Sequence, residues 1–263
     1  MALKQTIVLA FFFVIYMAQG QRVAIMGAMD KEIEFLKSEL ENKKKIQKSG
    51  VTFFTGKLKN KRVVLFKSGV GKVNASYCTA ILVENFNVTS LIFTGVAGGL
   101  HPEIKPGDIV ISNNLIQYDF GKLKNGEFEI WPTRNLKEKN NRNPLYLDVD
   151  PVLFKKSEKV SSRLKLKPFN NRLPKFYFGT IATGDNFISD TLKAKELNTK
   201  FNAIATEMEG AAVAQICTML NLPYIIIRSC SDNANTKAQT DYLKFVEVAA
   251  INSAHMVLGL LEE

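Results

Sequence analysis

The feature that most constrains this chain is a regular alternation of apolar, strand-like runs with segments of helical period. From residue 22 onward, runs such as "RVAIMGAM", "SLIFTGVAGGL" and "YIIIRSCSD" take turns with segments such as "DKEIEFLKSEL" and "GAAVAQICTML". Several runs are continuously apolar, which is typical of strands covered on both faces. The pattern predicts an α/β fold: a single-domain three-layer sandwich with a mixed, mostly parallel central sheet flanked by helices.

The expected elements can be placed along the chain. Strands are expected at 22–29, 90–100, 106–120, 176–184, 203–209 and 224–232, with a hairpin at 51–69 and a glycine-rich loop closing the second of these strands. Helices are expected at 30–40, 71–86, 151–164, 189–197, 210–220 and 240–261, with Asp150 capping the third and Pro151 in its first turn. Residues 121–143 are polar and rich in Lys and Asn, and we expect an irregular excursion there.

Length and composition limit the domain organisation. A chain of 263 residues with 46% hydrophobic and 23% charged residues can bury one substantial core, and no repeat or linker indicates a second domain. The first 20 residues have Lys4, an apolar stretch and a small-residue end at Gly20, which is the pattern of a secretory signal peptide. We therefore expect a signal peptide at 1–20, a catalytic domain at 21–263, and export; the alternative is an uncleaved leader and a cytoplasmic protein.

Metal and disulfide chemistry are not expected. The three cysteines are widely spaced within apolar surroundings, there is no C-x-x-C pair, and the chain has two histidines. Buried structural thiols and the absence of a metal are the expectation.

Acidic residues gather at the predicted strand ends. Glu32, Glu207, Glu209 and Asp232 follow or close apolar runs, and Arg228 lies in the last of these runs. Ligands of open α/β sheets bind at the carboxyl ends of strands, so we expect these residues near one rim. Glu207 and Glu209 are two positions apart on an expected strand and should share a face. Carboxylates brought together in a partly apolar cleft have pKa values pushed apart, which prepares a base and an acid.

Seven motifs in order carry a family resemblance. They read "GAMDKEIE", "KSGVGKVNA", "TGVAGGL", "PGDIVIS", "ATGDNFI", "ATEMEGAAVA" and "IIRSCSDNA". Together they closely resemble the 5'-methylthioadenosine/S-adenosylhomocysteine nucleosidases of the purine nucleoside phosphorylase superfamily, over nearly all of 22–261 except roughly 121–172. The resemblance implies a nucleoside phosphorylase-like fold, no cofactor, a homodimer, and hydrolysis of the N-glycosidic bond of methylthioadenosine, S-adenosylhomocysteine and 5'-deoxyadenosine, with release of adenine.

The resemblance also implies catalytic roles. Glu32 matches the general base that activates water, Asp232 matches the acid that protonates adenine N7, and Glu209 would receive the ribose 2'- and 3'-hydroxyls. Arg228 would help to hold the water and the acids, which is compatible with a buried ion pair to Glu207 or Glu209. Glu207 is left open between orienting the water or neighbouring polar groups and a structural role.

Substrate recognition follows from the same resemblance. Phe187 would stack on adenine with the backbone of Ile188 reading its edge, Met208 would pack on the sugar, and a further set would line the site: Met29, Val70 and Tyr242 around the 5'-alkylthio group, with Ser231, Val96 and Gly98. Val96 stands where the family often has serine, so a hydrogen bond to the water or ribose is expected to be lost. The aromatic residue contributed by a neighbouring subunit is expected among Phe120, Phe128 and Trp131.

Two other functions remain as alternatives. A purine nucleoside phosphorylase needs a dianion site, and the acidic first loop around Glu32 disfavours phosphate there. The net charge of +10 and a pI of about 9.4 suggest a second activity, binding of polyanions such as glycosaminoglycans. The basic clusters are Lys43 to Lys45, Lys57 to Arg62 and Lys155 to Lys167. A solvated surface is the simpler explanation of such clusters, because runs of charged residues usually are solvated. No motif for sequence-specific nucleic-acid recognition is present, and no transmembrane helix is expected in the mature chain.

Overall fold

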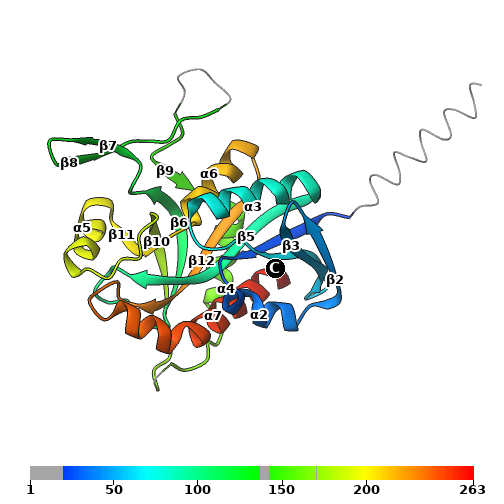
Figure 1. Cartoon of the computed structure of the whole chain (residues 1–263). Helices are drawn as coiled ribbons and strands as arrows, with labels where there is room; N and C mark the ends of the chain where they lie inside the picture. The colour runs from blue at the N-terminus through cyan, green and yellow to red at the C-terminus, as the bar shows by residue number, and fades with distance from the viewer. Residues whose placement is uncertain (1–19, 137–141, 170) are drawn as a thin grey trace, which may run out of the picture.

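The computed structural model describes residues 20–136, 142–169 and 171–263 (Figure 1). All but the last residue of the expected signal peptide therefore lies outside the described residues, as does part of the expected excursion at 121–143.

A ten-stranded mixed sheet forms the middle of the protein. Its order is β11-β10-β6-β12-β5-β1-β4-β3-β2, with β9 paired to β6 and an additional pairing between β11 and β5. The strands are β1 (Arg22–Gly27), β2 (Glu41–Lys48), β3 (Val51–Leu58), β4 (Lys61–Lys67), β5 (Val88–Gly99), β6 (Ile109–Gln117), β9 (Tyr146–Asp148), β10 (Phe176–Thr183), β11 (Ala203–Glu207) and β12 (Tyr224–Asp232). A separate hairpin joins β7 (Gly121–Lys124) to β8 (Glu127–Ile130).

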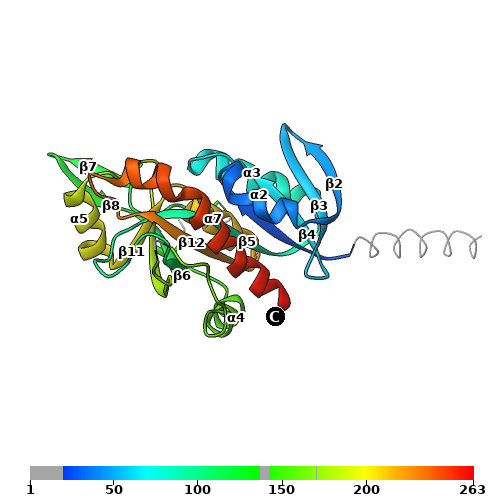
Figure 2. The same cartoon turned by 90° about the horizontal axis from the view of Figure 1, so that it is seen from below.

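Helices cover both faces of the sheet, as the continuous apolar runs predict (Figures 1 and 2). They are α2 (Asp30–Ser38), α3 (Lys72–Asn85), α4 (Pro151–Ser161), α5 (Thr191–Phe201), α6 (Gly210–Leu220) and α7 (Ala238–Glu262). In β1, Ala24 and Met26 belong to the core under α3 and α6, while Ile25 belongs to the core under α2 and α7. This alternation of neighbouring side chains between two cores gives the expected three-layer α/β sandwich.

Helix α7 is the longest element and belongs to the core. It is long and apolar enough to span a membrane by length and composition, yet 67% of its most apolar window is buried inside the protein. It packs on β12, β5, α2 and α4. Its apolarity is therefore explained by burial between the sheet and two other helices.

The strands run in two directions. Strands β1, β4, β5 and β12 are mutually parallel, while β6 is antiparallel to β12 and runs parallel to β10 and β11. The end of β5 bends so that Gly98 and Gly99 pair antiparallel with Thr206 and Ala205 of β11. The end of β11 therefore reaches the ends of β1, β5 and β12 from the opposite direction. The expected gathering of these strand ends is found although β11 is not parallel to the others.

Both described ends of the chain lie away from those strand ends. Gly20 lies beside Arg62 at the start of β4, and β1 begins two residues later. Helix α7 finishes at the same pole, where Lys59 Nζ is 2.9 Å from Glu262 Oε1 and Arg163 Nη2 is 2.6 Å from Glu263 Oε1.

Two expectations for local structure are wrong, and the sequence carried no expectation for the edge strand β2. Residues 41–48 form the exposed edge strand β2, although their sequence ENKKKIQK does not alternate between apolar and polar residues as a strand usually does. These residues form a strand because they pair with β3, and not because of their own strand propensity. Residues 121–130 include the hairpin β7–β8, with Asn125 and Gly126 at positive φ in its turn. The glycines 95, 98 and 99 belong to strand β5 itself and do not form a loop.

Candidate active site

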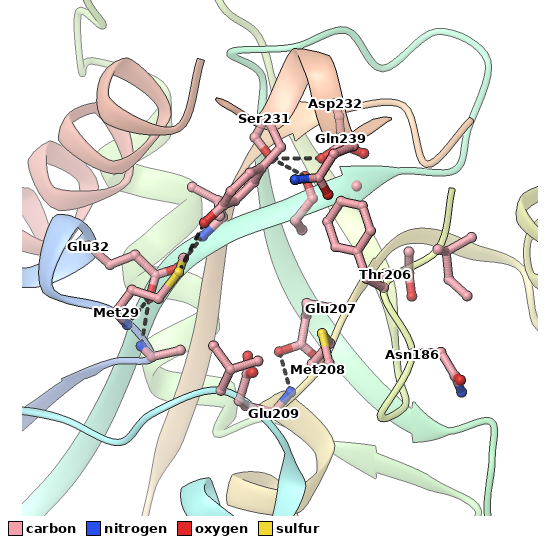
Figure 3. A pocket seen from close by; sticks show the side chains of 18 residues that line it. Met29, Glu32, Asn186, Thr206, Glu207, Met208, Glu209, Ser231, Asp232 and Gln239 are labelled. Carbon is pink, nitrogen blue, oxygen red and sulfur yellow. Dashed lines mark hydrogen bonds between the residues drawn. The ribbon is translucent and has the colours of Figure 1, made fainter. Parts of the chain in front are cut away.

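A cavity of about 360 Å³ opens where β1, β5, β11 and β12 end (Figure 3). Of the fourteen site residues expected from sequence, thirteen line it: Met29, Glu32, Val70, Val96, Gly98, Phe187, Ile188, Glu207, Met208, Glu209, Ser231, Asp232 and Tyr242. Arg228 does not line the cavity but lies behind it. Sequence reasoning missed Ala28, Ala97, Asn186, Thr206 and Gln239, of which the first four lie within or beside the quoted motifs.

Glu32 is held at the start of α2 by three backbone donors. Its Oε2 accepts the N–H of Ala28 and Met29 over 2.6 and 2.8 Å, and its Oε1 accepts the N–H of Val96 over 2.9 Å. Burial raises the pKa of Glu32, while Arg228 and these N–H groups oppose the rise. A buried, oriented carboxylate with a raised pKa is suited to act as a general base.

The link between Glu32 and Val96 bears on the missing serine. Val96 provides its main-chain N–H, which any residue except proline supplies at this position. The valine side chain therefore leaves the orientation of Glu32 intact, and only the hydrogen bond that a serine hydroxyl would make to the water or ribose is expected to be lost.

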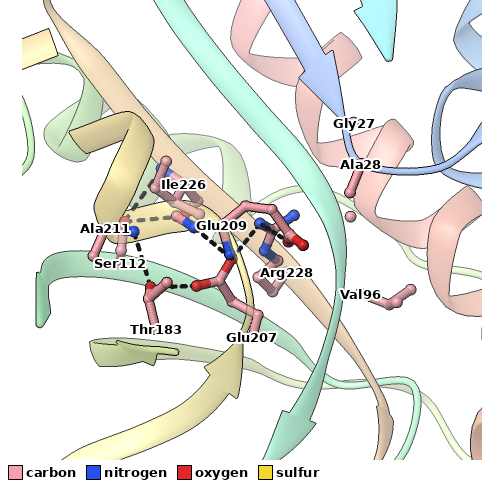
Figure 4. A network of polar contacts seen from close by, with 12 residues as sticks. Gly27, Ala28, Val96, Ser112, Thr183, Glu207, Glu209, Ala211, Ile226 and Arg228 are labelled. Atoms are coloured by element: carbon pink, nitrogen blue, oxygen red, sulfur yellow. Dashed lines mark hydrogen bonds and ion pairs between the residues drawn. The ribbon is translucent and has the colours of Figure 1, made fainter. Parts of the chain in front are cut away.

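Glu207 and Glu209 meet through a turn and not along a strand. Strand β11 ends at Glu207, and Glu209 is the N-cap residue of α6 with φ −138° and ψ −35°. Glu207 Oε2 accepts the N–H of Glu209 and of Gly210 over 3.0 and 2.7 Å, and its Oε1 accepts the Thr183 hydroxyl proton (Figure 4). The expectation that the two residues share a strand face was wrong, because the chain turns into α6 between them.

Of the two carboxylates, Glu209 accepts fewer hydrogen bonds from the protein. Its Oε1 accepts the N–H of Gly71 over 2.8 Å, and its Oε2 lies 3.6 Å from Arg228 Nη2. Burial raises the pKa of Glu209, and the neighbouring carboxylate of Glu207 raises it further. Because Glu207 is saturated with protein donors, Glu209 is the carboxylate with acceptor capacity left for a ligand.

Arg228 lies fully buried behind the carboxylates. Its Nη2 is 2.5 Å from Glu207 Oε2, and its guanidinium lies 3.9 Å from the ring centroid of Phe93 (Figure 4). Within the described part of the chain, its Nε and Nη1 have no hydrogen-bond partner. A Cβ at Gly95 would contact both Nη1 and Glu32 Oε1, so the missing side chain lets the guanidinium and Glu32 approach the same space.

Asp232 lies at the other end of the cavity. Its Oδ1 accepts the N–H of Ala234 and its Oδ2 accepts the hydroxyl of Ser231, each over 2.8 Å. Burial raises the pKa of Asp232 to about 6, against the opposing effect of these two hydrogen bonds. This carboxyl group can therefore carry a proton close to neutral pH and give it to a ligand.

Apolar side chains form the walls between these ends. The Phe187 and Tyr242 rings are 6.0 Å apart at 78°, and the Tyr242 hydroxyl lies 3.0 Å from Met29 Sδ. Phe187 is 44% exposed and Val70 is 45% exposed, whereas Ile188 is buried. The two exposed side chains therefore flank the mouth of the cavity.

Three charged residues join the two sides of the mouth. Lys72 Nζ is 2.5 Å from Asp119 Oδ1, and Lys72 N donates to Asp185 Oδ1 over 2.8 Å. Asp119 Oδ2 in turn accepts the N–H of Asp185 over 2.8 Å. Since Asp185 begins the loop that carries Phe187 and Lys72 follows Gly71, this Lys72–Asp119–Asp185 cluster connects the loop with the aromatic wall to the loop that binds Glu209.

The charges of the cavity favour a neutral ligand that develops positive charge. Among the described residues that line it, four are acids and none is Lys or Arg. The described part of the chain also contains no group of three His, Cys, Asp or Glu residues arranged to hold a metal ion. A paired base and acid at opposite ends suit the cleavage of a glycosidic bond.

Comparison with known proteins identifies the family. Residues 22–262 match the sequence model of the phosphorylase superfamily. The chain is 34% identical, over 91% of its length, to the 5'-methylthioadenosine/S-adenosylhomocysteine nucleosidase of Mycobacterium bovis, of which it covers 96%. It belongs to the methylthioadenosine/S-adenosylhomocysteine nucleosidase family. As a member of that family it is a nucleosidase, a hydrolase of N-glycosidic bonds.

Two further similarities refine this assignment. The chain is 36% identical to the aminodeoxyfutalosine nucleosidase of Campylobacter jejuni, with 92% of this chain and 99% of that protein covered. The crystal structure of the methylthioadenosine/S-adenosylhomocysteine nucleosidase from Neisseria meningitidis, in complex with methylthio-immucillin-A, superposes with a TM-score of 0.79 at 33% identity, covering 92% of this chain and 99% of that one. The nucleosidase fold predicted from sequence is thereby confirmed.

Proposed function

We propose that this nucleosidase hydrolyses 5'-methylthioadenosine and S-adenosylhomocysteine, and also 5'-deoxyadenosine, to adenine and the corresponding free sugar. The observation that carries the proposal is that Glu32 and Asp232, 200 positions apart in sequence, line one cavity from opposite ends. Relatives named for methylthioadenosine and S-adenosylhomocysteine match 91% and 92% of the chain.

The chemistry is divided between the two ends. Asp232 gives a proton to adenine N7, which turns a poor leaving group into a neutral one. Glu32 takes a proton from the water that attacks the anomeric carbon, on which oxocarbenium-like charge develops. Arg228 Nη1, which has no hydrogen-bond partner among the described residues, lies near Glu32 Oε1 and supports a role in orienting that water. Each proton transfer contributes about 10²- to 10⁴-fold in rate.

The sugar and the base are bound by the remaining residues. Glu209 accepts the 2'- and 3'-hydroxyl protons of ribose, while Glu207 holds Arg228 and the start of α6 in place. Met208 packs against the sugar and Phe187 stacks on adenine, a contact worth about 1–3 kcal/mol in nucleic-acid systems. Met29, Val70 and Tyr242 surround the 5'-alkylthio group.

Phosphorolysis is the alternative reaction, and it is separable by product analysis. The acids that line the cavity repel a phosphate dianion. We expect adenine release from methylthioadenosine in phosphate-free buffer, with free methylthioribose as the second product. Strict dependence on phosphate with formation of a sugar 1-phosphate would replace hydrolysis by phosphorolysis. Adenosine and inosine serve as control substrates for 5' and purine selectivity.

The proposal includes a homodimer. Exposed apolar side chains lie around the mouth of the cavity, on and before α3: Val70, Val73 at 79% exposure and Tyr77 at 50%. Phe120 is 40% exposed and precedes the hairpin β7–β8. Such a patch on a folded protein marks an interaction surface. Sedimentation equilibrium should give twice the chain mass; a fully active monomer at assay concentration would exclude the dimer.

Export of the protein is proposed from the leader alone, with cleavage after Gly20 leaving a domain of residues 21–263. Methylthioadenosine and S-adenosylhomocysteine arise inside cells, so an exported enzyme would act on nucleosides present outside them. N-terminal sequencing of the mature protein tests this: a chain that begins at Gln21 supports export, and a chain that keeps Lys4 favours the cytoplasm.

Polyanion binding is a second candidate activity, supported by the exposed lysines 43 to 45 on edge strand β2. The basic cluster from Lys155 to Lys167 offers less positive charge to a polyanion than its sequence suggests, because Lys159 and Arg163 both pair with Glu263. Lysines on an edge strand also prevent strand pairing between molecules, which is the simpler explanation. Retention on heparin that falls steeply with salt supports polyanion binding, whereas retention that does not change with salt contradicts binding by these charges.

A further inference from the structure

A second hollow, of about 450 Å³, is lined by residues of α2, of the start of β3 and of the end of β4. Its charged and turn residues include Asp30, Lys45, Gly50, Thr52, Lys67 and Gly69. None of these residues has a part in the chemistry proposed above.

The order of the strands shows where this hollow lies relative to the cavity. Strands β12, β5, β1, β4 and β3 are consecutive neighbours in the sheet. The cavity takes Asp232 from the first of these strands and Val70 from beyond the end of β4, whereas the hollow takes Lys67 and Gly69 from the end of β4 and Thr52 from the start of β3. Neighbouring strands are about 4.8 Å apart. The hollow therefore lies about one strand beyond Val70, on the side of the cavity away from Asp232, and this is the side on which the 5' group of the nucleoside is expected.

The chain itself joins the two spaces. Met29 lines the cavity and the next residue, Asp30, lines the hollow; Val70 lines the cavity and the preceding residue, Gly69, lines the hollow. A group that leaves the cavity between Met29 and Val70 therefore emerges beside residues that line the hollow.

The charges of the hollow match an amino-acid group. Lys67 Nζ and Asp30 Oδ2 are 2.6 Å apart and both side chains are largely exposed, so a cation and an anion are presented side by side. Lys37 and Lys45 add two further cations, neither of which has an ion-pair partner within the described chain. A ligand with both an ammonium and a carboxylate can exchange with the Lys67–Asp30 pair without leaving a charge unpaired.

We propose that this hollow binds the end of a long 5' substituent that carries an amino-acid group, with its carboxylate at Lys45 and Lys67 and its ammonium at Asp30. The inference rests on the proposed function, since the direction of the 5' group follows from ribose bound at Glu209. The methyl group of methylthioadenosine ends inside the cavity. The homocysteine tail of S-adenosylhomocysteine is long enough to pass between Met29 and Val70, so the hollow would set the preference between these substrates.

The test compares two substrates in the full-length enzyme. We expect Lys45→Gln/Lys67→Gln to lower kcat/KM for S-adenosylhomocysteine about three- to tenfold, as exposed ion pairs do, and to leave kcat/KM for methylthioadenosine unchanged. Lys48→Gln, which removes an exposed lysine of β2 outside the hollow, is the matched control and should change neither value. Salt should raise KM for S-adenosylhomocysteine alone.

The possible results are distinct. Equal values for both substrates in the double variant and the wild type would overturn the subsite, and so would an equal loss for both substrates, which would mean that the lysines only support the fold. A wild-type enzyme that does not cleave methylthioadenosine would overturn the proposed function itself. A 5'-thio nucleoside with a tail of equal length but no carboxylate should be insensitive to the double substitution.

Discussion

The proposed mechanism gives the cavity a sugar end and a purine end, and these two ends are built in different ways. At the sugar end, Glu32 accepts three backbone N–H groups, Glu207 accepts two, and Arg228 is fully buried between strands. At the purine end, Phe187 and Gln239 are exposed, and a single backbone N–H and a hydroxyl hold Asp232. Backbone donors fix the groups that meet developing charge, whereas the purine is met by side chains that can adjust.

Because of this contrast, we expect substitutions at the two ends to change different kinetic constants. Changes at the sugar end should lower kcat, because the geometry of the attacking water is set there. Changes in the walls of the purine end should raise KM, because they alter binding that is similar in the ground state and the transition state. Asp232 is the exception, since the proposed mechanism gives this residue of the purine end a part in the chemistry.

The largest effect is expected for Glu32→Gln. An amide cannot accept the proton of water, and its NH₂ group would face backbone N–H donors, so we expect kcat for methylthioadenosine to fall by about 10³-fold or more. Steady-state adenine release measures this. The melting temperature should stay close to that of the wild type, and a variant with near wild-type kcat would remove Glu32 from the mechanism.

Asp232→Asn should come next, with kcat lowered by about 10²- to 10³-fold and a changed pH profile. The pKa of Asp232 is raised to about 6, and the protonated form is the acid. The profile of kcat/KM reports the free enzyme, so in the wild type it should fall as the pH rises above about 6, while protonation of Glu32 lowers it on the acid side.

In the pH profile of kcat/KM, we expect the fall at alkaline pH to be caused by deprotonation of Asp232. This fall should disappear in Asp232→Asn, leaving residual activity that no longer falls above pH 6. If the fall keeps its position in the variant, another group donates the proton to adenine.

A smaller effect, mainly in KM, is expected for Phe187→Ala. Loss of stacking worth about 1–3 kcal/mol should raise KM for methylthioadenosine by about five- to a hundredfold, with kcat changed much less. Phe187→Tyr keeps the ring and is the matched control. A fall in kcat that exceeds the change in KM would mean that the two ends are not separable in the way described above.

The smallest effect is expected for Asp119→Asn, which weakens the Lys72–Asp119–Asp185 cluster. A partly buried, charge-assisted contact of this kind is worth about 1–2 kcal/mol, so KM should rise about five- to thirtyfold. Gly71 N–H opposes the rise in the pKa of Glu209, so a displaced loop should also move the KM–pH curve to higher pH. An unchanged curve and unchanged KM would limit the cluster to a surface contact.

Much of this architecture follows from local sequence, and the exceptions have identifiable causes. The apolar runs that became β1, β10 and β12 and the cap of α4, where Asp150 accepts the N–H of Leu153 over 2.8 Å, depend on residues close in sequence. Strand β2 was missed because its pairing with β3, and not its own composition, makes it a strand. The glycines of β5 were taken for a loop because glycine disfavours strands unless a close approach requires it.

In the site too, some features follow from nearby sequence and others depend on how distant segments pack. The motifs pointed to Glu32, Glu209 and Asp232 because these residues stand beside strand ends. Sequence could not place Gln239 in the cavity, since that depends on where the first turn of α7 lies relative to Asp232. It also could not show that Arg228 lies behind the cavity, which follows from the two-directional packing of β12 between β5 and β6.

The position of the two chain ends has a practical consequence. Gly20 and Glu263 lie at the pole opposite the opening that receives the nucleoside. A carrier, a bead or a fused partner joined to the chain at Gly20 or at Glu263 would therefore leave the entrance pointing outward. Immobilised in this way, the enzyme should keep the turnover of the free form.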